Sequence, residues 1–349
     1  MQFRPALLSA NDFPDIQVKS NAAIKADGTA DRKLPQGATK ALLVDRGRTA
    51  LFLIAQTLKN KTVWAPEYHC PAMIEPLYLA GVDVKFYPID EHFHVDIKFV
   101  NHHVKTNEAL LGVRFFGSLC NLSEVANVCR KNHILFIEDL AHAGLTDSMI
   151  GDIAITSLTK FYPDIVAAEL ILGEQNDFNE VLDDAYAKLP SRLMSKFRYK
   201  LLSIFAKLGL TQLQNKGTYT NTDVMHKLSK KQVEQSISTM SGAEIRDKRR
   251  ANFVSIAEVV DAQSWARVAC PLEYNMVPYV VPVYVDSEER FKAFRLAGIQ
   301  ALRWEEIATQ INNTDVLDMR GRLIQLPCHQ DLTEQQLSLI KQTIIGQQN

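Results

Sequence analysis

The sequence has few cysteines, no long apolar run and almost no net charge, and each absence excludes a class of protein. Its five cysteines form no Cys-x-x-Cys pair, the pattern of a zinc site or a dithiol redox centre. Scattered cysteines in odd number are typical of reduced thiols, so we expect a cytoplasmic protein. No stretch approaches about 18 consecutive apolar residues and the first residues do not form a signal peptide, so neither a membrane span nor secretion is expected.

Acidic and basic side chains nearly balance, with 39 Lys and Arg against 40 Asp and Glu. A formal net charge of -1 produces no field over the whole molecule that would attract nucleic acid or an anionic membrane. The basic run at 246–250 has helical periodicity and is typical of a solvated or phosphate-facing helix surface. The expected ligands are therefore small molecules.

From residue 41 onward, short apolar, β-branched runs alternate with helical patterns. Asn121-Leu122-Ser123-Glu124 predicts the start of one helix, with Asn121 as its N-cap. The alternation predicts an α/β fold with a mainly parallel sheet between helices, and ligands bind outside the carboxyl ends of such strands. Strands are expected at 61–64, 82–87, 109–113, 134–137 and 153–156, and helices at 48–59, 70–80 and 121–131.

A chain of 349 residues exceeds one typical domain, so we expect two domains. Residues 1–40 are polar and irregular and are expected to form an N-terminal arm. Residues 41–240 are expected to form the large domain, and 241–349 a smaller C-terminal α+β domain. Within the smaller domain the patterns predict strands at 279–285 and 322–326, a helix at 287–296, and a last helix that begins with a cap at 333–336.

Two neighbouring predicted strands end in residues that carry chemistry. One ends in Asp139 and is followed by His142, and the next ends in hydroxyls and Lys160. An Asp at a strand end is by itself more often a turn former or a cap, and a single lysine is more often on the surface. Together they are the pair that pyridoxal chemistry needs. A lysine amine forms a Schiff base with the cofactor aldehyde, and an aspartate keeps the pyridine nitrogen protonated.

The turn that leads into the first predicted helix, Asp45-Arg46-Gly47-Arg48-Thr49, has the pattern of an anion site. Backbone amides at a helix start bind phosphate, and the Thr49 hydroxyl adds a donor. Ser157, at the second strand end, is expected to donate to the same phosphate. A threonine near a helix start is by itself more often only a cap.

These motifs, in this order, resemble the pyridoxal-phosphate-dependent sugar aminotransferases of the DegT/DnrJ/StrS type, which share the aspartate aminotransferase fold, fold type I. The resemblance runs from about residue 47 to about residue 344. The matching stretches are Gly47-Arg48-Thr49-Ala50-Leu51, Trp64-Ala65-Pro66, Ala80-Gly81-Val82-Asp83-Val84, Phe115-Phe116-Gly117, Ile137-Glu138-Asp139-Leu140-Ala141-His142, residues 151–160, and Leu326-Pro327-Cys328-His329.

The resemblance implies a seven-stranded type of sheet, a homodimer, and pyridoxal 5′-phosphate bound on Lys160. Asp139 would pair with the pyridine nitrogen, and His142 would lie near the ring oxygen. The phosphate would be bound at Gly47 by the amides of Arg48 and Thr49 together with Ser157. The implied reaction is ping-pong transfer of an amino group from glutamate to a nucleotide-linked keto sugar, in surface polysaccharide or related biosynthesis.

Three segments depart from the family pattern. Relatives place a ring that stacks on the cofactor where this chain has Glu67-Tyr68-His69-Cys70-Pro71, and Tyr68 or His69 is expected to serve. Ala167-Ala168-Glu169 stands where relatives have two glycines. For the Asn-x-Arg segment that a neighbouring subunit lends, the candidate is Tyr219-Thr220-Asn221.

Two other interpretations stay open. The segment 167–169 is consistent with a pyridoxal-phosphate enzyme that acts on another carbonyl compound or by dehydration. The missing ring and glycine pair are consistent with a non-catalytic relative that serves as a scaffold or ligand sensor in polysaccharide assembly. Against the latter, a lysine and an aspartate that must be desolvated are costly for a protein that does not use them.

Overall fold

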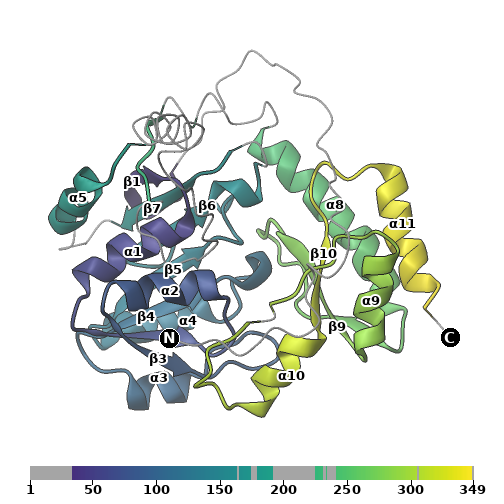
Figure 1. Cartoon of the computed structure of the whole chain (residues 1–349), viewed down its shortest axis with the longest axis horizontal. Helices are drawn as coiled ribbons and strands as arrows, with labels where there is room; N and C mark the ends of the chain where they lie inside the picture. The colour runs from purple at the N-terminus through teal and green to yellow at the C-terminus, as the bar shows by residue number, and fades with distance from the viewer. Residues whose placement is uncertain are drawn as a thin grey trace, which may run out of the picture.

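The computed structural model describes residues 34–162, 165–173, 179–191, 225–230, 233, 241–304 and 306–347. The predicted arm up to residue 33 and the candidate segment 219–221 lie outside these ranges. Within them the chain forms a seven-stranded sheet and a three-stranded sheet, which lie side by side in Figure 1. None of the helices in these ranges is long and apolar enough to cross a membrane.

The seven-stranded sheet has the strand order β1-β7-β6-β5-β4-β2-β3. The pairs from β3 through β2, β4 and β5 to β6 are parallel, whereas β7 is antiparallel to both β6 and β1. The prediction of a mainly parallel α/β sheet is thus confirmed. The strands are β1 (Ala38–Val44), β2 (Thr62–Pro66), β3 (Asp83–Tyr87), β4 (Ala109–Val113), β5 (Leu135–Leu140), β6 (Ile153–Ser157) and β7 (Ala168–Gly173).

Helices cover this sheet, and the three that the sequence predicts are all present. They are α1 (Gly47–Thr57), α2 (Pro71–Leu79) and α4 (Leu122–Lys131), with α3 (Ile97–His103) and α5 (Asn179–Lys188) in addition. α3 has only seven residues, too few for periodicity to reveal it. β1 begins at Ala38, so the last residues of the expected arm lie in the sheet.

Asn121 is the N-cap residue of α4, as predicted, but its side chain makes no cap hydrogen bond. Instead, Oδ1 accepts from the backbone N–H of Val95 at 2.9 Å and Nδ2 donates to the Val95 carbonyl at 2.9 Å. The Asn121 side chain thus satisfies both the backbone N–H and the backbone carbonyl of Val95, in the loop before α3. Two hydrogen bonds to the backbone stabilise this orientation more than one cap bond would.

The three-stranded sheet is antiparallel, with the order β10-β9-β8. α8 begins with a capping box between Ser241 and Glu244, and α11 with the predicted cap at Thr333. Figure 1 shows α8, α9 and α11 grouped around β9 and β10. The elements are α8 (Gly242–Asp261), β8 (Ala266–Val268), β9 (Val280–Val285), α9 (Glu288–Leu296), α10 (Thr314–Arg322), β10 (Leu323–Pro327) and α11 (Glu334–Ile345).

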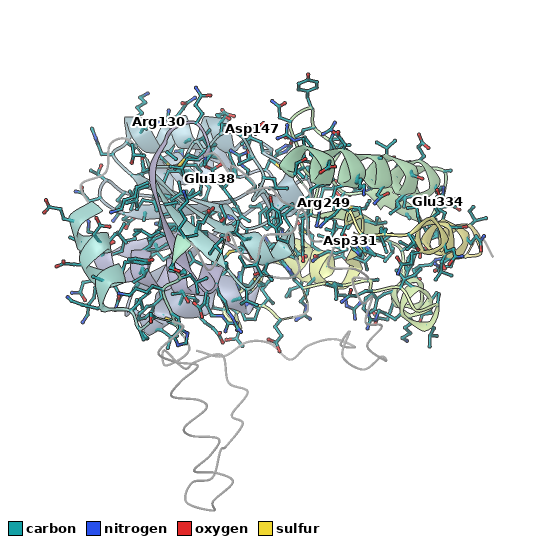
Figure 2. The ribbon with its side chains drawn as sticks, turned by 90° about the horizontal axis from the view of Figure 1, so that it is seen from above. Arg130, Glu138, Asp147, Arg249, Asp331 and Glu334 are labelled. Atoms are coloured by element: carbon teal, nitrogen blue, oxygen red, sulfur yellow. The ribbon has the colours of Figure 1, made fainter. Side chains whose placement is uncertain are left out.

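The basic run at 246–250 is not a uniformly solvated surface. Arg249 is only 2% exposed, and Arg250 is half-buried. Figure 2 shows Arg249 between the elements of the large sheet and those of the smaller sheet. The sequence pattern could not distinguish this arginine from its neighbours, because the partners that bury it come from other parts of the chain.

The sheet and α4 pack closely at Gly112 in β4, and a larger side chain there would test this packing. A Cβ added there would lie 2.5 Å from the Phe136 ring and 3.2 Å from Leu122. We expect Gly112→Ala to lower the free energy of unfolding by about 1–3 kcal/mol through overpacking, measured by urea denaturation. The control is Gly242→Ala at the start of α8, where a Cβ meets nothing within 4 Å. Equal losses in both variants would contradict this account.

Candidate active site

The parallel pairing of β5 with β6 brings the two predicted strand ends to one edge of the sheet. Asp139 lies opposite Ile155, and Leu140 opposite Thr156. Lys160 follows β6 in a 3₁₀ turn, Leu158–Lys160. Asp139, His142 and Lys160 line a single cavity of about 410 Å³, a volume typical of small-molecule sites.

Six of the nine sequence-predicted cofactor residues line this cavity. They come from the start of α1, from the end of β5 and from the end of β6. The six are Gly47, Arg48, Asp139, His142, Ser157 and Lys160. Thr49, Tyr68 and His69 are not part of its wall.

Lys160 is the amine of the cavity, and its surroundings favour the neutral form. Burial lowers the pKa of Lys160, while Cys70 and Asp139 act in the opposite direction. Nζ lies 4.8 Å from the centre of the Tyr279 ring, a cation–π distance. An amine with a lowered pKa is the more readily available nucleophile near neutral pH.

Asp139 is 5% exposed, and one of its oxygens is fixed from the backbone. Oδ1 accepts from the N–H of Ala141 at 2.8 Å. Burial raises the pKa of Asp139, whereas the Ala141 N–H and the charge of Lys160 lower it. A cationic ligand group beside this carboxylate would interact with it more strongly than in water, because the effective dielectric constant is low there.

His142 lines the cavity, and its tautomer is set by a backbone hydrogen bond. Its Nδ1 accepts from the backbone N–H of Phe116 at 3.1 Å, so a neutral ring carries its proton on Nε2. The ring stacks between Phe116 at 5.5 Å and Tyr279 at 4.6 Å. Burial and the charge of Lys160 both lower the pKa of His142, which keeps the imidazole neutral.

The start of α1 forms the basic end of the cavity. Arg46, Gly47 and Arg48 line it, and so does Ser157 at the end of β6. Helix N-terminal amides and the helix dipole favour an anion at such a place. Thr49 has another role: its hydroxyl donates to Asp45 Oδ1 at 2.7 Å and its N–H donates to the Arg46 carbonyl at 3.0 Å.

Tyr68 and His69, the expected stacking residues, are directed into the packing around the site. Tyr68 is 1% exposed and stacks on Trp304 at 5.0 Å. In His69, Nδ1 bonds to the Pro66 carbonyl at 3.0 Å and Nε2 accepts from the Ala308 N–H at 3.2 Å. Cys70, the N-cap of α2, lines the cavity instead.

Sequence reasoning missed the aromatic wall of the site. Trp304 lines the cavity, and Tyr279 lies under the Lys160 amine. Both come from segments that follow α8, far along the chain from the strand tips. No local pattern marks either residue, because a single aromatic side chain in a loop is ordinary.

Glu169 lies beside the site rather than in it. It is 7% exposed, pairs with Leu43 across β1 and β7, and accepts from the Thr156 hydroxyl at 3.1 Å. The cavity wall near this segment includes Val166 and not Glu169. The segment 167–169 therefore adds no acidic side chain to the cavity.

A buried ion pair supports the strand that carries Asp139. Arg114 Nε donates to Glu138 Oε1 at 2.6 Å, and both side chains are almost fully buried. Glu138 Oε2 accepts from the N–H groups of Ile150 and Gly151 at 2.7 and 3.1 Å. Because neighbouring residues of a strand point to opposite faces, Glu138 is fixed behind the sheet tip while Asp139 faces the cavity.

The buried imidazole of His69 makes stability depend on pH. Burial lowers its pKa from 6.5 to about 4, so below pH 6.5 the unfolded chain binds a proton that the native chain does not. Stability should therefore fall as the pH falls, and His69 should contribute a loss of about 2 kcal/mol between pH 7 and pH 5. Denaturation of His69→Gln at both pH values should show a pH dependence reduced by that amount.

The control for this measurement is His102→Gln, a change on the exposed part of α3. If His69→Gln and wild type lost the same stability between the two pH values, His69 would not be neutral in the native protein.

Residues 36–168 match the model of the DegT/DnrJ/EryC1/StrS aminotransferase family. The UDP-4-amino-4,6-dideoxy-N-acetyl-beta-L-altrosamine transaminase of Campylobacter jejuni, strain 81-176, is 21% identical over 341 residues, covering 89% of this chain and 86% of that protein. A second Campylobacter jejuni protein with the same name, from strain NCTC 11168, is 22% identical over the same length.

Solved structures agree with this match at the level of the fold. Helicobacter pylori PseC, an aminotransferase involved in the biosynthesis of pseudoaminic acid, has a TM-score of 0.68 at 12% identity, over 89% of this chain and 87% of that chain. DesV of S. venezuelae has a TM-score of 0.65 at 15% identity, over 88% and 84%. The predicted fold type I is confirmed, and the predicted resemblance to the DegT/DnrJ/StrS-type aminotransferases is confirmed by the family match over residues 36–168.

Proposed function

We propose that the protein is a pyridoxal-phosphate-dependent aminotransferase that moves an amino group from glutamate to a keto sugar carried on a nucleotide. One observation carries the proposal: the Lys160 amine, the Asp139 carboxylate and the basic start of α1 all face the same cavity. The name of the Campylobacter jejuni relative, a transaminase of a UDP-linked sugar, supports the substrate class.

The groups that line the cavity fit this cofactor. An aldehyde needs an amine, a pyridine nitrogen needs a carboxylate, and a phosphate needs N–H donors with positive charge nearby. Lys160, Asp139 and the Gly47–Arg48 turn supply these three in one cavity of about 410 Å³. When bound, pyridoxal 5′-phosphate supplies a carbonyl that condenses with amines and a ring that withdraws electrons from the reacting carbon.

Each residue then has a defined task. Lys160 would hold the cofactor through Nζ, and the same atom would move a proton, which the lowered pKa of Lys160 favours. Asp139 would hold a proton on the heterocyclic nitrogen of the cofactor. His142 donates from Nε2, because Nδ1 is occupied by the Phe116 N–H. Ser157 and the start of α1 hold the anionic end.

The alternative interpretations are less well supported. The acidic side chain of Glu169, which favoured a different carbonyl substrate or a dehydration, is bonded to Thr156 and does not line the cavity. A scaffold or sensor would have no use for the buried Asp139 beside an amine whose pKa is lowered. We include a homodimer and a cytoplasmic location in the proposal because the family resemblance and the scattered cysteines favour them.

Removing the amine tests the cofactor assignment. The purified protein should absorb in the visible when pyridoxal 5′-phosphate is attached to Lys160, and Lys160→Ala should abolish that band. Asp139→Asn should keep the cofactor and lose about 100-fold or more of the activity, because the electrostatic partner of the ring nitrogen is gone. An unchanged spectrum in Lys160→Ala would remove the proposal.

Half-reactions test the substrate class. Addition of glutamate alone should bleach the visible band, and a subsequent UDP-linked 4-keto sugar should restore it. The control is a keto acid other than 2-oxoglutarate, which should restore the band far more slowly. Recovery with small keto acids but not with the sugar nucleotide would favour the interpretation that the enzyme acts on another carbonyl compound.

A further inference from the structure

Arg249 in α8 carries a buried charge outside the cavity wall. The residue is 2% exposed, and burial lowers the pKa of its guanidinium. Nε donates to Gln330 Oε1 at 2.8 Å. The remaining donors go to backbone carbonyls: Nη1 to Pro278 and Tyr279 at 3.1 and 3.0 Å, and Nη2 to Lys160 at 2.9 Å. None of these four acceptors is a carboxylate, and three of them are backbone carbonyls. The carbonyl oxygens stabilise the buried charge, and the guanidinium in turn fixes the main chain at these residues.

The carbonyl of Lys160 is one that needs such a partner. It stands at the end of the 3₁₀ turn Leu158–Lys160, where carbonyls have no partner within the turn. The next carbonyl, that of Phe161, accepts from Gln330 Nε2 at 2.8 Å. The guanidinium also lies 4.7 Å from the centre of the Phe161 ring. Two side chains that bond to each other thus fix two consecutive carbonyls at the reactive lysine.

The same guanidinium fixes the aromatic wall beneath the amine. It bonds to the carbonyl of Tyr279, whose N–H donates to the Phe116 carbonyl at 3.0 Å. The Tyr279 ring stacks on His142 at 4.6 Å, and the Lys160 amine lies 4.8 Å from the centre of that ring. One cation therefore ties together the main chains of the lysine and of the ring on which its amine rests.

We propose that Arg249 is a positioning residue that sets where the Lys160 amine stands in the cavity. Arg249 is not part of the cavity wall, so it acts through Lys160 and Tyr279 and not by touching a ligand. The inference rests on the proposed function for the identity of Lys160 as the reacting amine. In this account Arg249 fixes the position of the Lys160 amine from α8, a helix that packs on the smaller sheet.

The four hydrogen bonds of residue 249 require the shape of an arginine side chain as well as its positive charge. A guanidinium presents five donors in a planar fork, which reach acceptors in three directions at once. Arg249 uses this fork on Gln330, on the 278–279 carbonyls and on the Lys160 carbonyl. A lysine at this position keeps the charge but cannot reach all these acceptors, so Arg249→Lys separates positioning from charge.

The experiment compares the full chain with Arg249→Lys and with the control Arg250→Met. Arg250 is the neighbouring arginine, and it also bonds two backbone carbonyls, those of Glu273 and Met276 at 2.8 and 2.7 Å, but not that of Lys160. Protein without added cofactor is labelled at several pH values with formaldehyde and a borohydride reductant, and modification of Lys160 is measured by peptide mass spectrometry. An amine released from its buried position is better hydrated, so its labelling midpoint in Arg249→Lys should rise by about one pH unit. The midpoint in Arg250→Met should equal that of wild type.

A second readout uses the protein with pyridoxal 5′-phosphate added. Misplacement of the amine should lower kcat by about tenfold or more, while KM for glutamate changes little. If Arg249→Lys lowered only the melting temperature and left the Lys160 labelling midpoint and kcat unchanged, Arg249 would be structural and the inference would fail.

Two further outcomes are distinguishable. If Arg249→Lys does not fold, Gln330→Leu, which removes the contact to the Phe161 carbonyl, should shift the labelling midpoint in the same direction; no shift there would overturn the inference. If wild type takes up no cofactor on Lys160, the proposed function fails, and the labelling midpoints still decide whether Arg249 positions that amine.

Discussion

The parallel pairing of β5 with β6 is the constraint on which the site depends. It places Asp139 opposite Ile155, so that the segment after β6 returns Lys160 to the cavity that the carboxylate faces. The carboxylate of Asp152 accepts from the Phe136 N–H at 2.8 Å, and the Arg114–Glu138 ion pair supports the same strand. A slip of one residue would turn Asp139 away from the cavity, because the side chains of a strand alternate between faces.

Burial then drives the ionisable groups of the cavity toward their neutral forms. It lowers the pKa values of Lys160 and His142 and raises that of Asp139. Shifts of this kind cluster at functional sites, because a catalytic group needs a pKa matched to its task. A cationic ring nitrogen of a ligand would favour the charged form of Asp139, and an anionic end would complement Arg46 and Arg48 at the start of α1.

Residues from both parts of the fold line or support this cavity, but they differ in kind. The large sheet and α1 supply Asp139, Lys160 and the basic end of the cavity, whereas the segments after α8 supply Trp304 to its wall and Tyr279 beneath the Lys160 amine. Arg249 connects the two, since it reaches from α8 to the carbonyls of Lys160 and Tyr279. Figure 2 shows it at the boundary between the differently coloured parts of the ribbon.

The sequence by itself determined β2 to β6, β9 and β10, though not β1, β7 or β8, and it predicted that Asp139 and Lys160 share one site, because periodicity and strand-end chemistry are local properties. Only the tertiary structure decided which face of a segment meets the cavity. Cys70 lines it and Tyr68 does not, because Trp304 covers Tyr68. Thr49 turns to Asp45, and Arg249 is buried within a run that resembles a solvated surface. In each case the orientation of the side chain depends on a contact with a residue from another part of the fold. The spacing of residues along the chain does not specify how a helix or turn is rotated against its neighbours.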